Sequence, residues 1–219
     1  MPKLATLKQP ESLAKMAYES IRQSILSGQW KIGELYNEMG IASDLGISRT
    51  PAREALLELA SQDLIIFMPR RGLMLNRFTR RDVDEIFELR KAIELASVEK
   101  IANISPRVDL IAIEESLLEQ RRAVKQKDYL LFIEADRLFH TSLCMLTNNR
   151  RMIAIVENIR DMIHVMGIKA LGLEGRALKV IEEHQAIFKA VGNGNAEEAR
   201  NAMAYHLDQS KEAVNEDLN

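Results

Sequence analysis

The feature that most constrains the fold is a run of about 135 residues, beginning at Thr79, with helical spacing of apolar side chains and no strand pattern. The predicted helices span residues 82–103, 107–126, 129–146, 149–171, 176–192 and 196–215. The breaks between them fall at Ser105-Pro106, Lys127-Asp128, Asn148-Asn149, Gly172 to Gly175, and Gly192 to Asn195. This part of the chain is therefore predicted to be an all-α bundle of about six helices, which makes the protein mainly α.

The segment before this run has a different pattern. "ESLAKMAYESIRQSILSG" has the apolar spacing of a helix. Asn37 can cap a short second helix that ends at Gly46, and Ser48 or Thr50 can cap a third, whose first turn tolerates Pro51. A short helix, a tight turn and a longer helix form the helix-turn-helix pattern. "LIIFMPRRGLMLNRF" follows and predicts a β-hairpin with a basic tip.

Charge is unevenly distributed along the chain. The formal net charge of -2 by itself argues against a nucleic-acid-binding protein. Residues 1–77, however, hold ten basic and eight acidic side chains, whereas residues 78–219 hold twenty and twenty-four. No acidic residue lies between Asp63 and Asp82, a stretch that contains Arg70, Arg71, Arg77, Arg80 and Arg81. The region of the hairpin is therefore predicted to form a local positive strip.

The start of the chain and its single cysteine, Cys144, bear on its location. One cysteine excludes an internal disulfide framework, and "MPKLATLKQPESLAK" lacks the apolar core of a secretory signal. No stretch approaches the roughly 20 apolar residues that span a membrane. We expect a soluble cytoplasmic protein with no membrane partner.

Two arginines stand at the start of the third predicted helix. Arg49 and Arg53 are four residues apart, so they share one strip of the first turn beside the apolar stripe that includes Leu59. The planar fork of arginine suits guanine O6 and N7 or a phosphate. The alternative is a solvated helix start with a salt bridge. The short helix before this pair and the basic hairpin after it favour contact with DNA.

The stretch "LYNEMGIASDLGISRTPAREALLELASQDLIIFMPRRGLML" closely resembles the winged-helix DNA-binding domain of the GntR family of bacterial transcription regulators, with the family signature at Leu45 to Leu56. It departs from the family pattern at Ile32, where proline is frequent, and at Gly40, where a polar helix former is usual. The resemblance implies a winged helix-turn-helix. It also implies DNA contacts from Ser48, Arg49, Thr50 and Arg53 on the recognition helix and from Arg70, Arg71 and Gly72 in the wing.

The four histidines all lie in the helical part of the chain. His184 and His206 have apolar neighbours at helical spacing, and a buried imidazole needs a partner. His140 follows Asp136 by one helical turn, so these two side chains can bind a single ion. Three histidines and one aspartate from three helices predict a metal site. The alternative is a set of unrelated core histidines with hydrogen bonds and a surface aspartate. His164 has no pairing ligand in its own turn and is left out of the site.

The helical part also resembles a known domain, through "FELRKAIELASVEKIA", "DRLFHTSL" and "EEHQAIFKAVGNGNAEEARNAMAYHL". These stretches are similar to the effector-binding domain (FCD type) of the metal-binding branch of the FadR subfamily of GntR regulators. The resemblance implies that a divalent metal lies beneath a pocket for a small organic acid, held by Asp136, His140, His184 and His206. Zinc is expected, although nickel or manganese would also accept this mixed nitrogen and oxygen set.

Two further residues are candidates for the pocket. Arg90 occupies the family's "LR" position and is suited to pair with a ligand carboxylate. Its alternative role is an i,i+4 surface bridge with Glu94. Asn158, on the fourth predicted helix of the bundle, is a weaker candidate for ligand binding.

Together these patterns predict a winged helix-turn-helix at residues 1–77, a linker at 78–81 and an effector-binding and dimerisation domain at 82–219. The expected function is that of a non-enzymatic, ligand-responsive transcription regulator that binds a pseudo-palindromic DNA operator as a homodimer. Two alternatives use the same His/Asp site. One is a metal-dependent hydrolase, in which the metal activates water, and the other is a metal sensor with no organic ligand.

Overall fold

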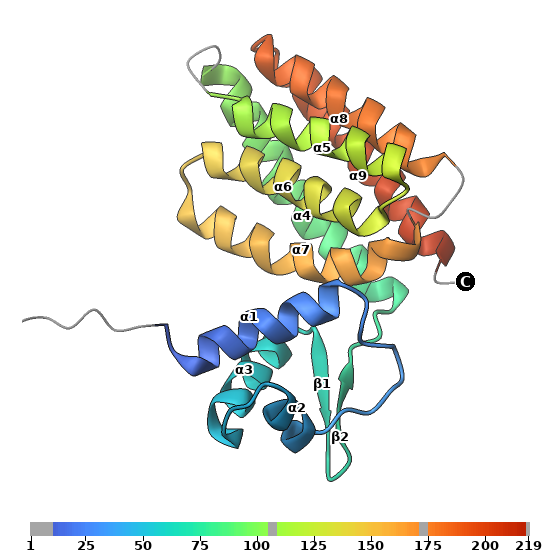
Figure 1. Cartoon of the computed structure of the whole chain (residues 1–219). Coiled ribbons are helices and arrows are strands. Elements are labelled where there is room, and N and C mark those ends of the chain that lie inside the picture. The colour runs from blue at the N-terminus through green and yellow to red at the C-terminus, as the bar shows by residue number, and fades with distance from the viewer. Residues whose placement is uncertain (1–10, 105–108, 171–174, 218–219) are drawn as a thin grey trace, which may run out of the picture. The chain divides into compact units, whose positions relative to one another are not determined.

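The computed structural model describes residues 11–104, 109–170 and 175–217 (Figure 1). Within these ranges the chain is mainly helical and divides into two compact units, Met1–Arg77 and Phe78–Asn219. The predicted breaks at Ser105-Pro106 and at Gly172 lie outside the described residues. The predicted fold class, a winged helix-turn-helix followed by an all-α bundle, is confirmed.

The first unit contains three helices and a two-stranded hairpin. The elements are α1 (Leu13–Leu26), α2 (Glu38–Asp44), α3 (Arg49–Ser61), β1 (Ile65–Met68) and β2 (Gly72–Leu75). The strands pair antiparallel, with Ile65 opposite Leu75 and Met68 opposite Gly72. Helices α1 and α3 pack together over a core that includes Ala17, Ile21, Ile25, Ala52, Ala55, Leu56, Leu59, Leu64 and Leu73.

The helix caps of this unit show where local chemistry sets the boundaries. Asn37 caps α2 as predicted, because its side chain accepts a hydrogen bond from the Gly40 backbone N–H at 2.6 Å. Ser48 occupies the N-cap position of α3, but its side chain makes no capping hydrogen bond, and Thr50 lies within the first turn. Ser48 is therefore the N-cap residue, as predicted, but without a side-chain hydrogen bond, and the helix begins where it was expected.

Gly72 allows the wing to approach the segment before α2. Its φ of +121° is unfavourable for other residues, and a Cβ atom here would lie 2.2 Å from the Tyr36 carbonyl oxygen. Tyr36 pairs with Leu73 through two backbone hydrogen bonds of 2.8 and 2.9 Å. Glycine is therefore required at position 72 for backbone packing, whatever contact this residue makes with a ligand.

The second unit contains six described helices, as predicted. They are α4 (Arg80–Ile104), α5 (Ile111–Gln126), α6 (Tyr129–Leu146), α7 (Arg150–Ala170), α8 (Arg176–Gly192) and α9 (Ala196–Asp217). Helix α4 begins two residues earlier than predicted, because Asp82 accepts hydrogen bonds of 2.6 Å from both the backbone N–H and the hydroxyl of Thr79. Arg80 and Arg81, expected in a linker, therefore belong to the helix.

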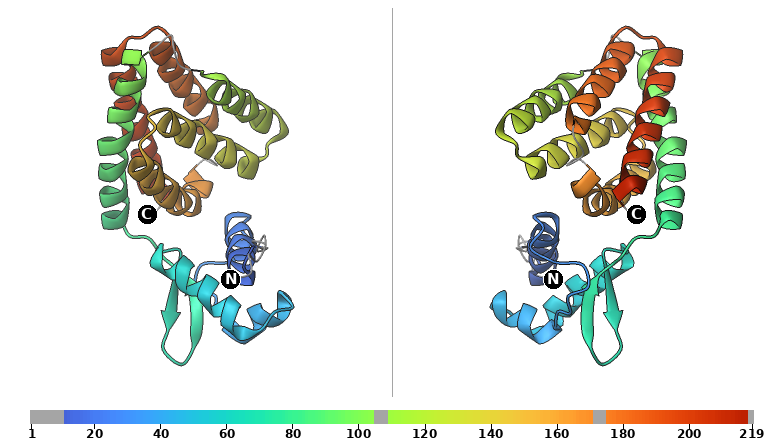
Figure 2. Two further views of the ribbon diagram at one scale, coloured as in Figure 1. Left: turned by 90° about the vertical axis from the view of Figure 1, so that its left-hand side faces the viewer. Right: turned by 90° about the vertical axis from the view of Figure 1, so that its right-hand side faces the viewer.

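The helices of this unit pack pairwise. Helix α4 runs beside α9, α5 beside α6, α8 beside α9, and α6 beside α7 (Figure 2). One apolar core contains Val98, Ile101, Phe139, Leu143, Ile187, Met203 and Leu207. Among the described helices, none is both long and apolar enough to cross a membrane. Polar side chains from the same helices are also buried inside this unit, and they form the site described next.

Candidate metal centre and nucleic-acid interface

Four predicted metal ligands meet inside the bundle. Asp136 and His140 lie one turn apart on α6, His184 lies on α8, and His206 on α9. One potential ligand atom from each of the four residues lies within 4.8 Å of the others. The Nε2 atom of His206 is 3.2 Å from Nε2 of His184 and 3.2 Å from Nε2 of His140. The three histidines are at most 1% exposed, so their side chains are almost fully removed from bulk water.

The other ring nitrogen of each histidine, Nδ1, faces an oxygen acceptor. Nδ1 of His140 contacts the Glu94 carboxylate, and Nδ1 of His206 lies 2.7 Å from the Glu183 carboxylate. Nδ1 of His184 lies 2.9 Å from the side-chain oxygen of Gln120. Each acceptor favours a proton on Nδ1, which leaves Nε2 with a lone pair in a neutral imidazole.

The arrangement therefore points three lone pairs at one position. Nε2 of His206 lies 3.2 Å from each of the other two Nε2 atoms, and lone pairs this close repel one another unless a cation lies between them. Two nitrogens that are each about 2.1 Å from one ion, and about 100° apart around it, lie about 3.2 Å from each other. The alternative of separate core histidines explains the Nδ1 atoms, which have ordinary hydrogen-bond partners, but it does not explain the convergence of the Nε2 atoms.

The electrostatics of the four residues suit metal binding. Burial, with a contribution from Arg160, lowers the pKa of His140 well below its usual value, and burial likewise lowers the pKa of His184. Burial also lowers the pKa of His206 to about 3. For Asp136, burial is the largest single influence and raises the pKa, but Arg160 and the three histidines together outweigh it, so the net shift is downward. Neutral imidazoles and an ionised carboxylate are the states in which these side chains bind metals.

Arg160 also orients the aspartate. Its guanidinium pairs with Oδ2 of Asp136, while Oδ1 lies 3.6 Å from Nε2 of His184 and 3.8 Å from Nε2 of His140. One carboxylate oxygen is therefore held by an arginine and the other faces the histidines. A ligand oxygen fixed in this way is typical of metal sites in proteins.

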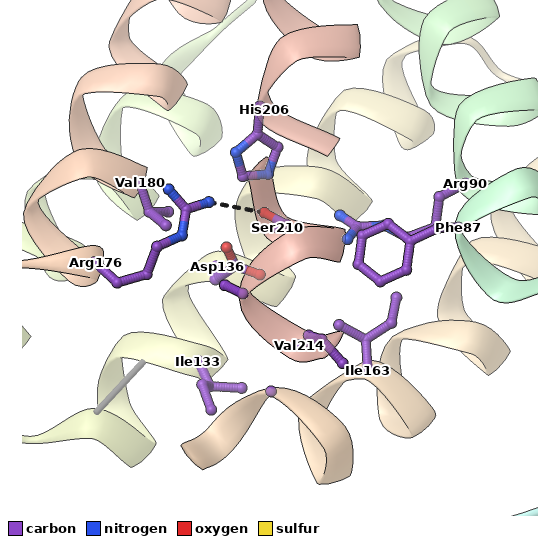
Figure 3. Close-up of a pocket in the computed structure, with 12 residues that line it drawn as sticks. Phe87, Arg90, Ile133, Asp136, Ile163, Arg176, Val180, His206, Ser210 and Val214 are labelled. Atoms are coloured by element: carbon purple, nitrogen blue, oxygen red, sulfur yellow. Dashed lines mark hydrogen bonds between the residues drawn. The ribbon is translucent and has the colours of Figure 1, made fainter. Parts of the chain in front are cut away.

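A pocket of about 490 Å³, its open mouth included, lies beside Asp136 and His206 (Figure 3). Arg90 borders it, with Nη2 3.3 Å from Nε2 of His140. Arg176 lies across the pocket from Arg90, hydrogen-bonded to Ser210 at 3.1 Å. The rest of the lining is largely apolar and includes Phe87, Ile133, Ile163, Val180, Ala213 and Val214. The pocket thus combines apolar walls with a few cationic groups, as small-molecule sites do.

The structure separates the two candidate pocket residues. Arg90 lines the pocket and also binds Glu94 at 2.7 Å, but both side chains are only 2% exposed, so this contact is not the surface bridge that was considered. Asn158 is exposed and is not among the residues that line this pocket. Helix α7 turns Ile163 toward the pocket and leaves Asn158 on its outer face. His164 is buried on α7 and lies outside the group of four ligands.

The predicted DNA-contacting residues lie on exposed parts of the first unit. Ser48, Arg49, Thr50 and Arg53 are exposed at the start of α3, and Arg70 and Arg71 are exposed at the tip of the hairpin. A groove of about 1100 Å³ runs between the start of α3 and the hairpin, and all four of these arginines line it. The considered salt bridge is present too, because Arg49 and Arg53 both bind Glu38 of α2 at 2.7 Å.

Sequence reasoning missed the residues that support these sites. Glu38, Arg160 and Glu183 each contact a predicted functional side chain from another helix. Arg176 lines the pocket and pairs with Glu183. Periodicity within one helix does not report such partners. A usable signal did exist for Glu183, because this acidic residue lies on a largely apolar face of its helix, where a charge needs a counter-charge such as Arg176 two turns earlier.

A winged helix-turn-helix followed by a helical unit with a largely apolar pocket that holds a few charged groups is the architecture of a transcription regulator that is built from a DNA-binding and an effector-binding part. Family models match both units: the bacterial regulatory proteins of the gntR family at residues 13–75, and the FCD domain at residues 85–209. The chain belongs to the GntR family of transcriptional regulators, and its second unit is an FCD domain.

Relatives of this chain are themselves named as regulators. The chain is 29% identical to the HTH-type transcriptional regulator YdhC of Bacillus subtilis (strain 168), over 94% of this chain and 92% of that protein. It is 31% identical to an HTH-type regulator in an unstable DNA locus of Streptomyces ambofaciens, over 87% and 80%. A crystal structure of a GntR regulator from Rhodococcus sp. RHA1 has the same fold, with a TM-score of 0.84 at 22% identity over 93% and 98% of the chains.

Proposed function

We propose that this transcription regulator binds a pseudo-palindromic operator as a homodimer in the cytoplasm, and that it senses a small organic acid at a divalent metal in its helical unit. The observation that carries the sensing part is the convergence of three Nε2 lone pairs beside a pocket bordered by Arg90. The four ligands are Asp136, His140, His184 and His206. When bound there, the ion supplies a Lewis-acidic centre that attracts a carboxylate.

The chain's own residues then orient the effector. Arg90 lies beside His140 and offers a guanidinium to the same carboxylate. Arg176 and Ser210, across the pocket, are placed to bind a second polar group of the ligand. The apolar walls exclude water, which strengthens both ionic contacts.

The DNA-binding part follows from the exposed arginines of the first unit. Arg49 and Arg53 stand at the start of α3 with Ser48 and Thr50, where a recognition helix meets base edges. We assign Arg70 and Arg71 to phosphate contacts from the wing. For Gly72, its packing against Tyr36 supports a role in shaping the wing in addition to any backbone contact with DNA.

Elemental analysis of untagged protein tests the metal first, and thermal shift with a panel of mono- and dicarboxylates, run with metal and with a chelator, tests the effector. We expect one bound ion per chain and carboxylate stabilisation that requires it. Absence of any metal, with no stabilisation by added zinc, nickel or manganese, would overturn the metal site. Metal without a carboxylate response would indicate a metal sensor, and metal-dependent turnover of esters or amides would indicate a hydrolase.

A further inference from the structure

One carboxylate lies beneath both arginines proposed to read the operator. Glu38, the first residue of α2, accepts a 2.7 Å hydrogen bond from Nε of Arg49 and another of 2.7 Å from Nη1 of Arg53. The side chain of Glu38 is 12% exposed, whereas those of Arg49 and Arg53 are 63% and 50% exposed. The acid is therefore nearly covered while both guanidiniums face solvent. The hydrogen bond from Arg49 lowers the pKa of Glu38, which keeps the carboxylate ionised at neutral pH.

The atoms used in these two bonds leave useful donors on both arginines. Arg49 donates through Nε, so its two terminal nitrogens remain for another acceptor. Arg53 donates through Nη1, so Nε and Nη2 remain. Each guanidinium thus keeps a pair of adjacent N–H groups. Guanine presents O6 and N7 as a matching pair of acceptors in the major groove.

A second contact fixes Arg53 from another direction. The centre of its guanidinium lies 5.9 Å from the centroid of the Phe67 ring, on β1 of the hairpin. Arg53 is therefore held between a carboxylate of α2 and an aromatic ring of the wing. Both contacts are made within the first unit, before any DNA is present.

Rigid side chains discriminate between DNA sequences better than mobile ones, because an arginine held in one orientation cannot adapt to a phosphate or to a mismatched base. A carboxylate beside the interface also repels phosphates, which weakens binding to DNA that offers no matching acceptors. We propose that Glu38 is a specificity-determining residue that holds Arg49 and Arg53 in the orientation that reads bases. This inference rests on the proposed function, in which α3 enters the DNA groove.

Fluorescence anisotropy of the full chain can test the role of Glu38. The probes are an operator selected from random-sequence DNA and a scrambled duplex. For Glu38→Ala we expect operator affinity to fall by about tenfold, and scrambled-DNA affinity to rise by about threefold because a negative charge is lost. Glu38→Gln keeps one acceptor oxygen and should lie between the wild type and Glu38→Ala. The matched control is Glu58→Gln, which removes one exposed negative charge further along α3 and should change the affinities for both duplexes by the same small factor.

The outcomes separate this inference from the proposed function. If the wild-type protein does not prefer any selected duplex over scrambled DNA, the proposed function fails and the role of Glu38 fails with it. If the wild type is specific but Glu38→Ala strengthens binding to both duplexes as Glu58→Gln does, Glu38 acts only through its charge. If Glu38→Ala weakens both equally and lowers the melting temperature, Glu38 only supports the fold. Either of the last two results overturns the specificity role alone.

Discussion

The two units of this protein place their functional charges in opposite environments. In the first unit, Arg49 and Arg53 are at least half exposed and share the carboxylate of Glu38. In the second unit, Arg90, Arg160 and Arg176 are less than 10% exposed, and each pairs with an acid of its own. A buried charge left without its partner costs far more free energy than an exposed one. Substitutions in the helical unit should therefore reduce folding stability, whereas those in the first unit should reduce binding and leave stability nearly unchanged.

The largest effect is expected from Arg160→Met in chelator-treated protein. This change leaves the Asp136 carboxylate without its main counter-charge, and breaking a buried pair in this way costs about 3 to 5 kcal/mol of unfolding free energy. Urea unfolding followed by circular dichroism measures the loss. The control is Arg151→Met, an exposed position on the same helix, which should stay within about 0.5 kcal/mol of wild type. A loss below about 1 kcal/mol at Arg160 would show that this pair is not the main compensation for Asp136.

Metal should stabilise the helical unit without stabilising the first unit. At a hundredfold excess over Kd, a ligand that binds only the folded state adds about 2.7 kcal/mol. Chelation should lower the melting temperature, and His206→Ala should abolish the response to added metal. His164→Ala should keep the metal content of wild type, because His164 lies outside the four-ligand group. A metal response that survives in His206→Ala would place the site elsewhere.

Acid should destabilise the metal-free protein through the same histidines. Burial lowers the pKa of His140, His184 and His206 in the folded state, whereas the unfolded chain takes up protons near the reference pKa of about 6.5. The unfolded state therefore binds more protons as the pH falls, and stability decreases. For three imidazoles the loss between pH 7 and pH 6 is about 2 kcal/mol, and it continues toward the lowered folded-state pKa values. Urea unfolding with a chelator present tests the slope, which should be about one third shallower in His206→Ala.

The sequence predicted some features of the helical unit and missed others. Helical periodicity and breaks at glycine or asparagine predicted all six helices of the bundle, since burial of an apolar face is a local pattern. The Asp136 and His140 pair was visible because both residues share one turn of α6. Gln120, which contacts His184 from another helix, was not visible, because this contact depends on how the helices pack. Asn158 lies on an exposed face of α7, and the position of a residue along a helix does not by itself say which face of the helix turns inward.

Substitutions in the recognition helix should weaken DNA binding and leave stability nearly unchanged, whereas Arg160→Met is expected to lower stability. Arg49→Ala or Arg53→Ala should weaken operator binding by roughly 1 to 3 kcal/mol and relax the preference at one operator position. Because both side chains are exposed, unfolding free energy should change by less than about 0.5 kcal/mol. Anisotropy against the operator and its single-base variants, with urea unfolding in parallel, measures both quantities. Unchanged affinity in the double variant would remove these arginines from the interface and end the contrast between the units.

The smallest effect is expected at the tip of the wing, where it should differ in kind from the effect at the recognition helix. Arg70 and Arg71 are exposed on the hairpin loop, and the structure gives neither of them a counterpart to Glu38 within the described residues. Exposed arginines without a fixed partner suit phosphate contacts, which position a protein without reading sequence. Arg70→Ala or Arg71→Ala should therefore weaken the operator and scrambled DNA alike and reduce the slope of log K against log salt by about 1. A loss confined to the operator would instead mean that the wing reads bases. The specificity of the first unit would then come from two elements, of which only one is held by Glu38.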